Sequence, residues 1–178
     1  TILVFGGSQG SRTINEQFFL AMQGLPLKTP WQVIHVTGRE GFQKMKERYG
    51  RFTLPSCVRE YMDDIVEAYA VADLVIARSG AGTVAELGLL GIPAILIPYP
   101  HAKNHQIENA RVLERLGMAV IIEEKCLRQD ILRDKLFAQI RRDTSLDRRS
   151  MDRERLSEFF ISNGAERLAD ELVKVVHD

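Results

Sequence analysis

The sequence predicts an α/β protein built on a doubly wound, Rossmann-like parallel sheet of about six strands with flanking helices. Short apolar segments alternate along the chain with longer segments whose apolar residues recur every three or four positions, a pattern typical of strands alternating with amphipathic helices. The short segments are apolar throughout, as expected for strands that helices cover on both faces. Right-handed crossovers would then place successive strands in one sheet.

The elements follow in order from the first residue. Residues 2–5 form the uninterrupted apolar run Ile-Leu-Val-Phe, and 74–77 form the run Leu-Val-Ile-Ala. The expected strands are 2–5, 32–36, 58–61, 74–77, 94–98 and 119–123. The expected helices between them are 12–22, 41–49, 65–70, 83–90 and 105–116. Beyond residue 125 the strand pattern stops, and helices are expected at 127–142, 147–160 and 165–176.

The 178 residues suit a single domain, with a Rossmann-like core at 1–125 and C-terminal helices at 126–178. The first strand begins at once and no Met precedes it, so we expect an excised piece of a longer protein. Equal numbers of basic and acidic residues, 24 of each, argue against a general nucleic-acid binder. Cys57 and Cys126 have no metal-site or disulfide spacing, which suits a reducing compartment. No apolar run approaches the roughly 20 residues of a membrane span.

A glycine-rich loop, Gly-Gly-Ser-Gln-Gly-Ser-Arg at 6–12, follows the first strand and opens the first helix. Ligands of such sheets bind at the carboxyl ends of strands, and free N–H groups at a helix start attract phosphate. Alternatively, the glycines only make a tight turn, with Ser8 or Ser11 capping the helix. The loop is neither GxxxxGK[ST] nor GxGxxG, and no acidic residue ends the second strand, so a P-loop NTPase site and a NAD site are not expected.

A second small-residue loop at 77–86 leads from the fourth strand into a helix. Glu86 lies near the start of that helix, where a carboxylate can accept hydrogen bonds from a ribose diol. Thr83 and Glu86 also have the spacing of a capping box, a purely structural alternative. Both interpretations are open from the residues alone.

A third polar cluster, 98–110, follows the fifth strand. His105 and Asn109 share one helix face with Gln106 beside them, and such neutral donors and acceptors suit sugar hydroxyls. His101 and His105 have no carboxylate partner in the sequence pattern, so no metal site is expected. His35 lies inside an apolar strand and is expected to be a hydrogen-bonded core histidine.

Together these segments resemble the MurG family of peptidoglycan synthesis, GT-B glycosyltransferases of family 28. The resemblance covers residues 1 to about 125 well and the remainder only as a helical pattern. It is carried by Gly-Gly-Ser-Gln-Gly-Ser-Arg (6–12), Thr37-Gly38, Tyr-Met-Asp-Asp (61–64), Ala-Tyr-Ala-Val-Ala-Asp (68–73), Arg-Ser-Gly-Ala-Gly-Thr-Val-Ala-Glu (78–86), Gly-Ile-Pro (91–93), Pro-Tyr-Pro (98–100) and His-Gln-x-x-Asn-Ala (105–110). Ser11 departs from the family, which usually has Ala there.

The resemblance implies a C-terminal domain that binds UDP-GlcNAc, in an inverting enzyme that converts lipid I to lipid II without a cofactor or metal. By motif, Gly7, Ser8, Gln9 and Gly10 would lie by the diphosphate; Met62 would hold the uracil through backbone groups; Ala81, Gly82 and Thr83 would lie beside the phosphates and sugar; Glu86 would bind the ribose; and His105, Gln106 and Asn109 would bind the GlcNAc hydroxyls.

The catalytic base, the acceptor loops and the membrane-facing patch would belong to an N-terminal domain absent from this sequence. The resemblance places the full-length enzyme in the cytoplasm, peripheral at the inner face of the bacterial membrane, where the lipid-linked acceptor is its partner. The alternatives are another GT-B UDP-sugar transferase, a donor-binding subunit with a different acceptor, or a UDP-GlcNAc 2-epimerase. An epimerase needs acid/base carboxylates around the sugar, and Glu86 is the only well-placed acid in these loops.

Overall fold

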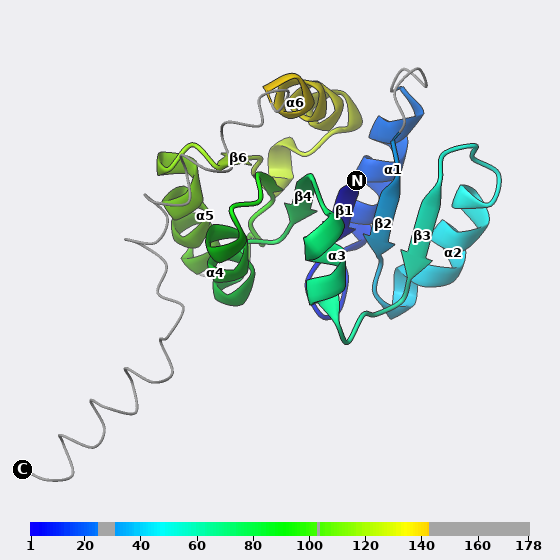
Figure 1. Cartoon of the computed structure of the whole chain (residues 1–178), viewed down its shortest axis with the longest axis horizontal. Coiled ribbons are helices and arrows are strands. Elements are labelled where there is room, and N and C mark those ends of the chain that lie inside the picture. The colour runs from blue at the N-terminus through cyan, green and yellow to red at the C-terminus, as the bar shows by residue number, and fades with distance from the viewer. Residues whose placement is uncertain (25–30, 103, 143–178) are drawn as a thin grey trace, which may run out of the picture.

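A computed structural model describes residues 1–24, 31–102 and 104–142. In these residues the chain forms a six-stranded parallel sheet in the order β3-β2-β1-β4-β5-β6. The strands are β1 (Ile2–Phe5), β2 (Val33–Val36), β3 (Ser56–Arg59), β4 (Leu74–Ala77), β5 (Ala94–Leu96) and β6 (Ala119–Ile121). The doubly wound parallel sheet expected from the sequence is therefore confirmed (Figure 1).

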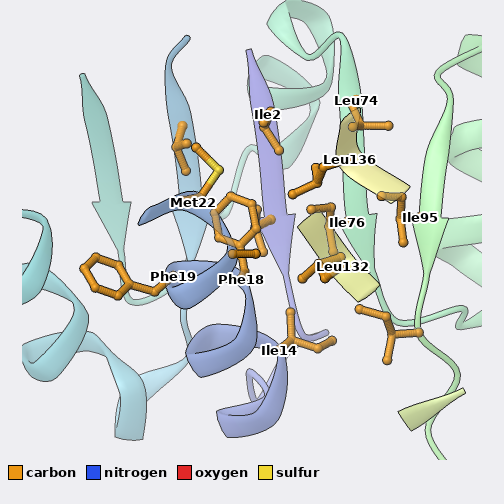
Figure 2. Close-up of a cluster of buried hydrophobic side chains, with 14 of the residues drawn as sticks. Ile2, Ile14, Phe18, Phe19, Met22, Leu74, Ile76, Ile95, Leu132 and Leu136 are labelled. Carbon is orange, nitrogen blue, oxygen red and sulfur yellow. The ribbon is translucent and has the colours of Figure 1, made fainter. Parts of the chain in front are cut away.

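Helices cover both faces of this sheet. They are α1 (Arg12–Gln23), α2 (Arg39–Tyr49), α3 (Ile65–Val71), α4 (Ala81–Leu90), α5 (His105–Arg115) and α6 (Gln129–Arg142), with a 3₁₀ turn at Glu124–Cys126. Buried side chains of α1, α2 and α6 form one core with the sheet, and those of α3, α4 and α5 form the other. Figure 2 shows Phe18 of α1 and Leu132 and Leu136 of α6 on the first of these cores.

The largest shift from an expected strand position is at the edge of the sheet. β3 spans Ser56–Arg59 rather than 58–61. Its residues are exposed or half-buried because it has only one neighbour, so it lacks the all-apolar pattern that marks β1 and β4. Helix α4 begins at Ala81, two residues before the expected start. The helices expected at 147–160 and 165–176 lie outside the described residues.

The strand order reverses direction at β1, which pairs with both β2 and β4. Phe5, the last residue of β1, lies opposite Val36 of β2 and Ala77 of β4 in the register. The loops that follow these three strands therefore begin side by side at the carboxyl edge of the sheet. A doubly wound sheet forms its ligand crevice at this reversal, outside the carboxyl ends of the strands.

Candidate functional site

The loop after β1 wraps tightly before α1 begins. Gly7 and Gly10 have φ of 86° and 77°, conformations that favour glycine, and the Gly10 N–H donates to the Gly7 carbonyl at 3.0 Å. A side chain at Gly10 would overlap the backbone of Thr37, so this glycine lets the loop pack on the end of β2. Ser11 caps α1 by accepting from the Ile14 N–H at 3.4 Å, which confirms one of the two capping residues considered from the sequence.

A buried polar network supports this loop through Thr37, on which Gly10 packs. His35 is fully buried, with its Nε2 3.0 Å from Asn15 Oδ1 and its Nδ1 3.1 Å from the Tyr49 hydroxyl. Since the Asn15 oxygen only accepts, the proton lies on Nε2, and Tyr49 donates to Nδ1. Asn15 Nδ2 then donates to the Thr37 carbonyl at 2.8 Å. The expectation of a hydrogen-bonded core histidine is confirmed, and burial lowers the pKa of His35 to about 3.

Arg78, the first residue after β4, joins the two glycine-rich loops. Its side chain is only 10% exposed. Its polar contacts are the Ser11 hydroxyl (2.9 Å), the carbonyls of Ile97 (3.2 Å) and Pro98 (3.3 Å), and the Glu124 carboxylate (2.6 Å). Burial is the largest single influence and tends to raise the pKa of Glu124, but the hydrogen bonds from Arg78 and Thr13 and the positive charge of Arg78 together lower this pKa, so the carboxylate stays ionised. Arg78 thus links the α1 cap, the end of β5 and the 3₁₀ turn.

Glu86 stands on the second turn of α4 and is exposed. The helix begins after Gly80, which makes no side-chain cap, so Thr83 and Glu86 are both inside the helix. The capping-box interpretation is therefore wrong, because a box needs the Thr at the position before the helix. Instead, Glu86 Oε2 accepts a hydrogen bond from the Tyr69 hydroxyl at 2.8 Å.

The loop after β4 and the start of α5 are hydrogen-bonded to one another. The Ser79 hydroxyl donates to the Gln106 carbonyl at 2.7 Å, and Asn109 Nδ2 donates to the Ser79 carbonyl at 3.2 Å. Gln106 Oε1 accepts from the Tyr99 N–H at 2.9 Å. His105 is the exposed first residue of α5. Part of each amide expected to bind sugar is thus occupied in shaping the loops, which leaves the Gln106 amide nitrogen and the Asn109 oxygen for a ligand.

The remaining predicted residues border the same edge of the sheet. Ser8 and Gln9 are exposed in the first loop, Ala81 and Gly82 form the exposed first turn of α4 with half-buried Thr83, and half-buried Met62 packs on the core just before α3. A cavity of about 540 Å³ adjoins the first loop, lined by Gln9–Arg12, Thr37 and residues of α1 and α2. In the described part of the chain, no group of three or more His, Cys, Asp or Glu side chains is placed to hold a metal, and no helix could cross a membrane.

Sequence reasoning did not assign roles to Tyr69, Arg78 and Asn15. Arg78 did carry a signal, since a charged residue directly after an all-apolar strand must find partners at the sheet edge. Tyr69 lies among apolar helix residues and Asn15 among polar ones, and nothing local marks either residue as part of the site.

Comparison with known proteins shows which family the chain resembles in sequence. The chain matches the glycosyltransferase family 28 C-terminal domain over residues 1–171. It is 43% identical over 143 residues, 79% of this chain, to the UDP-N-acetylglucosamine–N-acetylmuramyl-(pentapeptide) pyrophosphoryl-undecaprenol N-acetylglucosamine transferase of Coxiella burnetii, of which it covers 40%. It is 41% identical over 156 residues, 87% of this chain, to the transferase of that name from Dichelobacter nodosus, of which it covers 42%.

Solved structures of glycosyltransferases are also similar to this chain. The crystal structure of Acinetobacter baumannii MurG superposes with a TM-score of 0.82 at 27% identity, covering 97% of this chain and 51% of that one. The calicheamicin glycosyltransferase CalG4 superposes at 0.68 with 21% identity over 97% of this chain and 41% of that one, which shows the shared fold. This chain spans about two fifths of the length of these curated relatives.

Proposed function

The chain belongs to the glycosyltransferase family 28 C-terminal domain family, and we propose that it is the donor-binding half of an inverting transferase that moves GlcNAc from UDP-GlcNAc to lipid I, forming lipid II. One observation carries the proposal. The loops expected to bind the donor meet at the point where the strand order reverses, in a chain 43% identical to a transferase named for this reaction. We place the whole enzyme in the cytoplasm, at the inner membrane face.

The diphosphate is proposed to lie between the starts of α1 and α4. Gly7, Ser8, Gln9 and Gly10 supply the first set of backbone groups. Ala81, Gly82 and Thr83 supply the second. Both helices are at least ten residues long, so their free N–H groups and dipoles favour an anion there. Arg78 lies beneath both loops, where its hydrogen bond to Ser11 and its ion pair with Glu124 hold the loops in place.

In this proposal the ribose, the uracil and the GlcNAc contact residues on either side of the phosphate loops. Glu86 binds the ribose hydroxyls, and Met62 holds the uracil through its backbone. His105, Gln106 and Asn109 at the start of α5 bind the GlcNAc hydroxyls. The hydrogen bonds that join Ser79 to α5 support this arrangement, because they hold the sugar-binding amides beside the phosphate loop.

The chemistry is a direct displacement. The acceptor hydroxyl oxygen forms a bond to the anomeric carbon, the bond from that carbon to the β-phosphate oxygen breaks, and UDP leaves with the electron pair. A base from the other half of the enzyme takes the hydroxyl proton. The role of this domain is to stabilise the charge that develops on UDP with preorganised amides. By itself the domain binds donor and does not transfer it.

Calorimetric titration of this chain with UDP-GlcNAc, UDP-glucose and UDP tests the proposal. We expect UDP-GlcNAc to bind most tightly, and Glu86→Gln to weaken all three ligands by roughly tenfold or more, since a charge-assisted hydrogen bond is lost. Glu114→Gln is the matched control, because it neutralises an exposed glutamate near the far end of α5. Tighter binding of UDP-glucose, or equal effects of the two substitutions, would contradict the proposal.

A further inference from the structure

We propose that Tyr69 sets the preference of the nucleotide site for ribose over 2′-deoxyribose by holding the carboxylate of Glu86 in place. This inference rests on the proposed function, in which Glu86 accepts hydrogen bonds from the ribose. Tyr69 acts as a positioning residue. Its single hydroxyl proton is donated to Glu86 Oε2 at 2.8 Å, so it orients the group that meets the ligand.

The core fixes the tyrosine. Tyr69 is 3% exposed, and its ring packs edge-on against Phe5, with centroids 6.0 Å apart and an interplanar angle of 76°. Phe5 is the last residue of β1, at the point where the strand order reverses. Burial, reinforced by Glu86, raises the pKa of the Tyr69 phenol, so the hydroxyl keeps its proton and remains a donor. A rigid donor therefore stands at the edge of the proposed site.

Glu86 has little else to hold it. It is exposed on α4, and in the part of the chain that the structure describes no cation lies within ion-pair distance of it. A glutamate in solvent samples many rotamers, and ordering it on ligand binding costs affinity. The bond from Tyr69 removes most of that freedom before the ligand arrives.

The held carboxylate faces the proposed nucleotide site. Glu86 Oε1 lies 4.0 Å from the position that a side chain at Gly82 would occupy, so the carboxylate points back over the first turn of α4. That turn is where the phosphates are proposed to lie. With Oε2 held by Tyr69, Oε1 keeps both lone pairs and Oε2 one, enough for the two hydroxyls of a ribose. A 2′-deoxyribose offers one donor fewer.

Titration with UDP and 2′-deoxy-UDP measures the effect. We expect the wild-type chain to bind UDP roughly ten- to a hundredfold more tightly, the worth of one hydrogen bond to a carboxylate. Tyr69→Phe should weaken UDP and reduce this ratio by about threefold or more, because an unheld carboxylate must be ordered by the ligand. Tyr49→Phe is the control. It removes a buried hydroxyl bonded to His35 in the network that supports the first loop, so any effect on phosphate binding should be equal for the two nucleotides and the ratio should stay unchanged.

The variants distinguish failure of this inference from failure of the proposed function on which it rests. Suppose that Glu86→Gln abolishes the preference for UDP but Tyr69→Phe weakens both nucleotides equally and keeps that preference. The positioning role of Tyr69 would then be overturned, while the ribose role of Glu86 would stand. An unchanged ratio in Glu86→Gln, or no saturable UDP binding by the wild type, would overturn the ribose role of Glu86 and this inference with it. If Tyr69→Phe does not fold, Glu86→Asp decides, since it keeps the charge but withdraws it from Tyr69. A retained ratio in Glu86→Asp would then refute the inference.

Discussion

Replacing Arg78 by Met tests whether one buried guanidinium joins the two glycine-rich loops. The substitution keeps a long apolar side chain but removes the charge and every hydrogen-bond donor. Four acceptors lose a partner. They are the Ser11 hydroxyl, the Ile97 and Pro98 carbonyls, and the Glu124 carboxylate.

The magnitude follows from burial. Removing one partner of a buried ion pair costs about 3–5 kcal/mol of unfolding free energy when the other charge is trapped. The Glu124 side chain is 20% exposed and can turn partly toward water, so we expect the lower end, about 3 kcal/mol, carbonyls included. Arg78→Lys keeps a charge for Glu124 but not the planar fork that reaches Ser11 and the carbonyls, so we expect a loss of about 1–2 kcal/mol.

Urea unfolding of the three proteins, followed by circular dichroism, gives these differences if the slope is unchanged. Arg128→Met is the control, since Arg128 pairs with Asp130 at the surface, and we expect no measurable loss from it. Binding gives a second measure. Arg78→Met should weaken UDP more than uridine, because the loops it joins are those proposed to hold the phosphates. Stability of Arg78→Met within about 0.5 kcal/mol of wild type would refute the reasoning.

Two further predictions concern the first loop and the polar network that supports it. Because the pKa of folded His35 is about 3, the unfolded chain takes up a proton as pH falls below about 6.5 while the folded chain does not, so unfolding free energy should drop by about 2 kcal/mol between pH 6.5 and 5. Urea midpoints measured across this pH range should show the drop in the wild-type chain. If unfolding free energy depends on pH equally steeply in a His35→Gln chain, the prediction is contradicted. Gly10→Ala should destabilise by more than Gly7→Ala in thermal melts. Both have positive φ, at a cost of about 1–2 kcal/mol, but only the Gly10 side chain would meet Thr37. Equal effects would show that the loop does not need this close approach.

The local pattern of residues carries the fold and the location of the site. All-apolar strands such as Ile2–Phe5 and Leu74–Ala77 indicate a sheet buried on both faces, and right-handed crossovers restrict the order of its strands. Small residues directly after those two strands mark the loops that meet at the reversal. The predicted bounds are wrong where the local signal is weak, as at exposed β3, and alternatives stay open where the signal is ambiguous, as for Thr83 and Glu86.

Tertiary structure decides which side chains hold the site together. Arg78 meets Ser11 across 67 positions of the sequence, and Tyr69 meets Glu86 across 17. These meetings depend on the register of β1 with β4 and on the direction in which each helix projects its side chains, neither of which a local pattern specifies. The sequence by itself therefore determines that two glycine-rich loops lie at the carboxyl edge of a parallel sheet. Only the packed structure determines that a buried arginine joins them and that a core tyrosine holds the exposed glutamate, because both contacts form when distant segments are brought together.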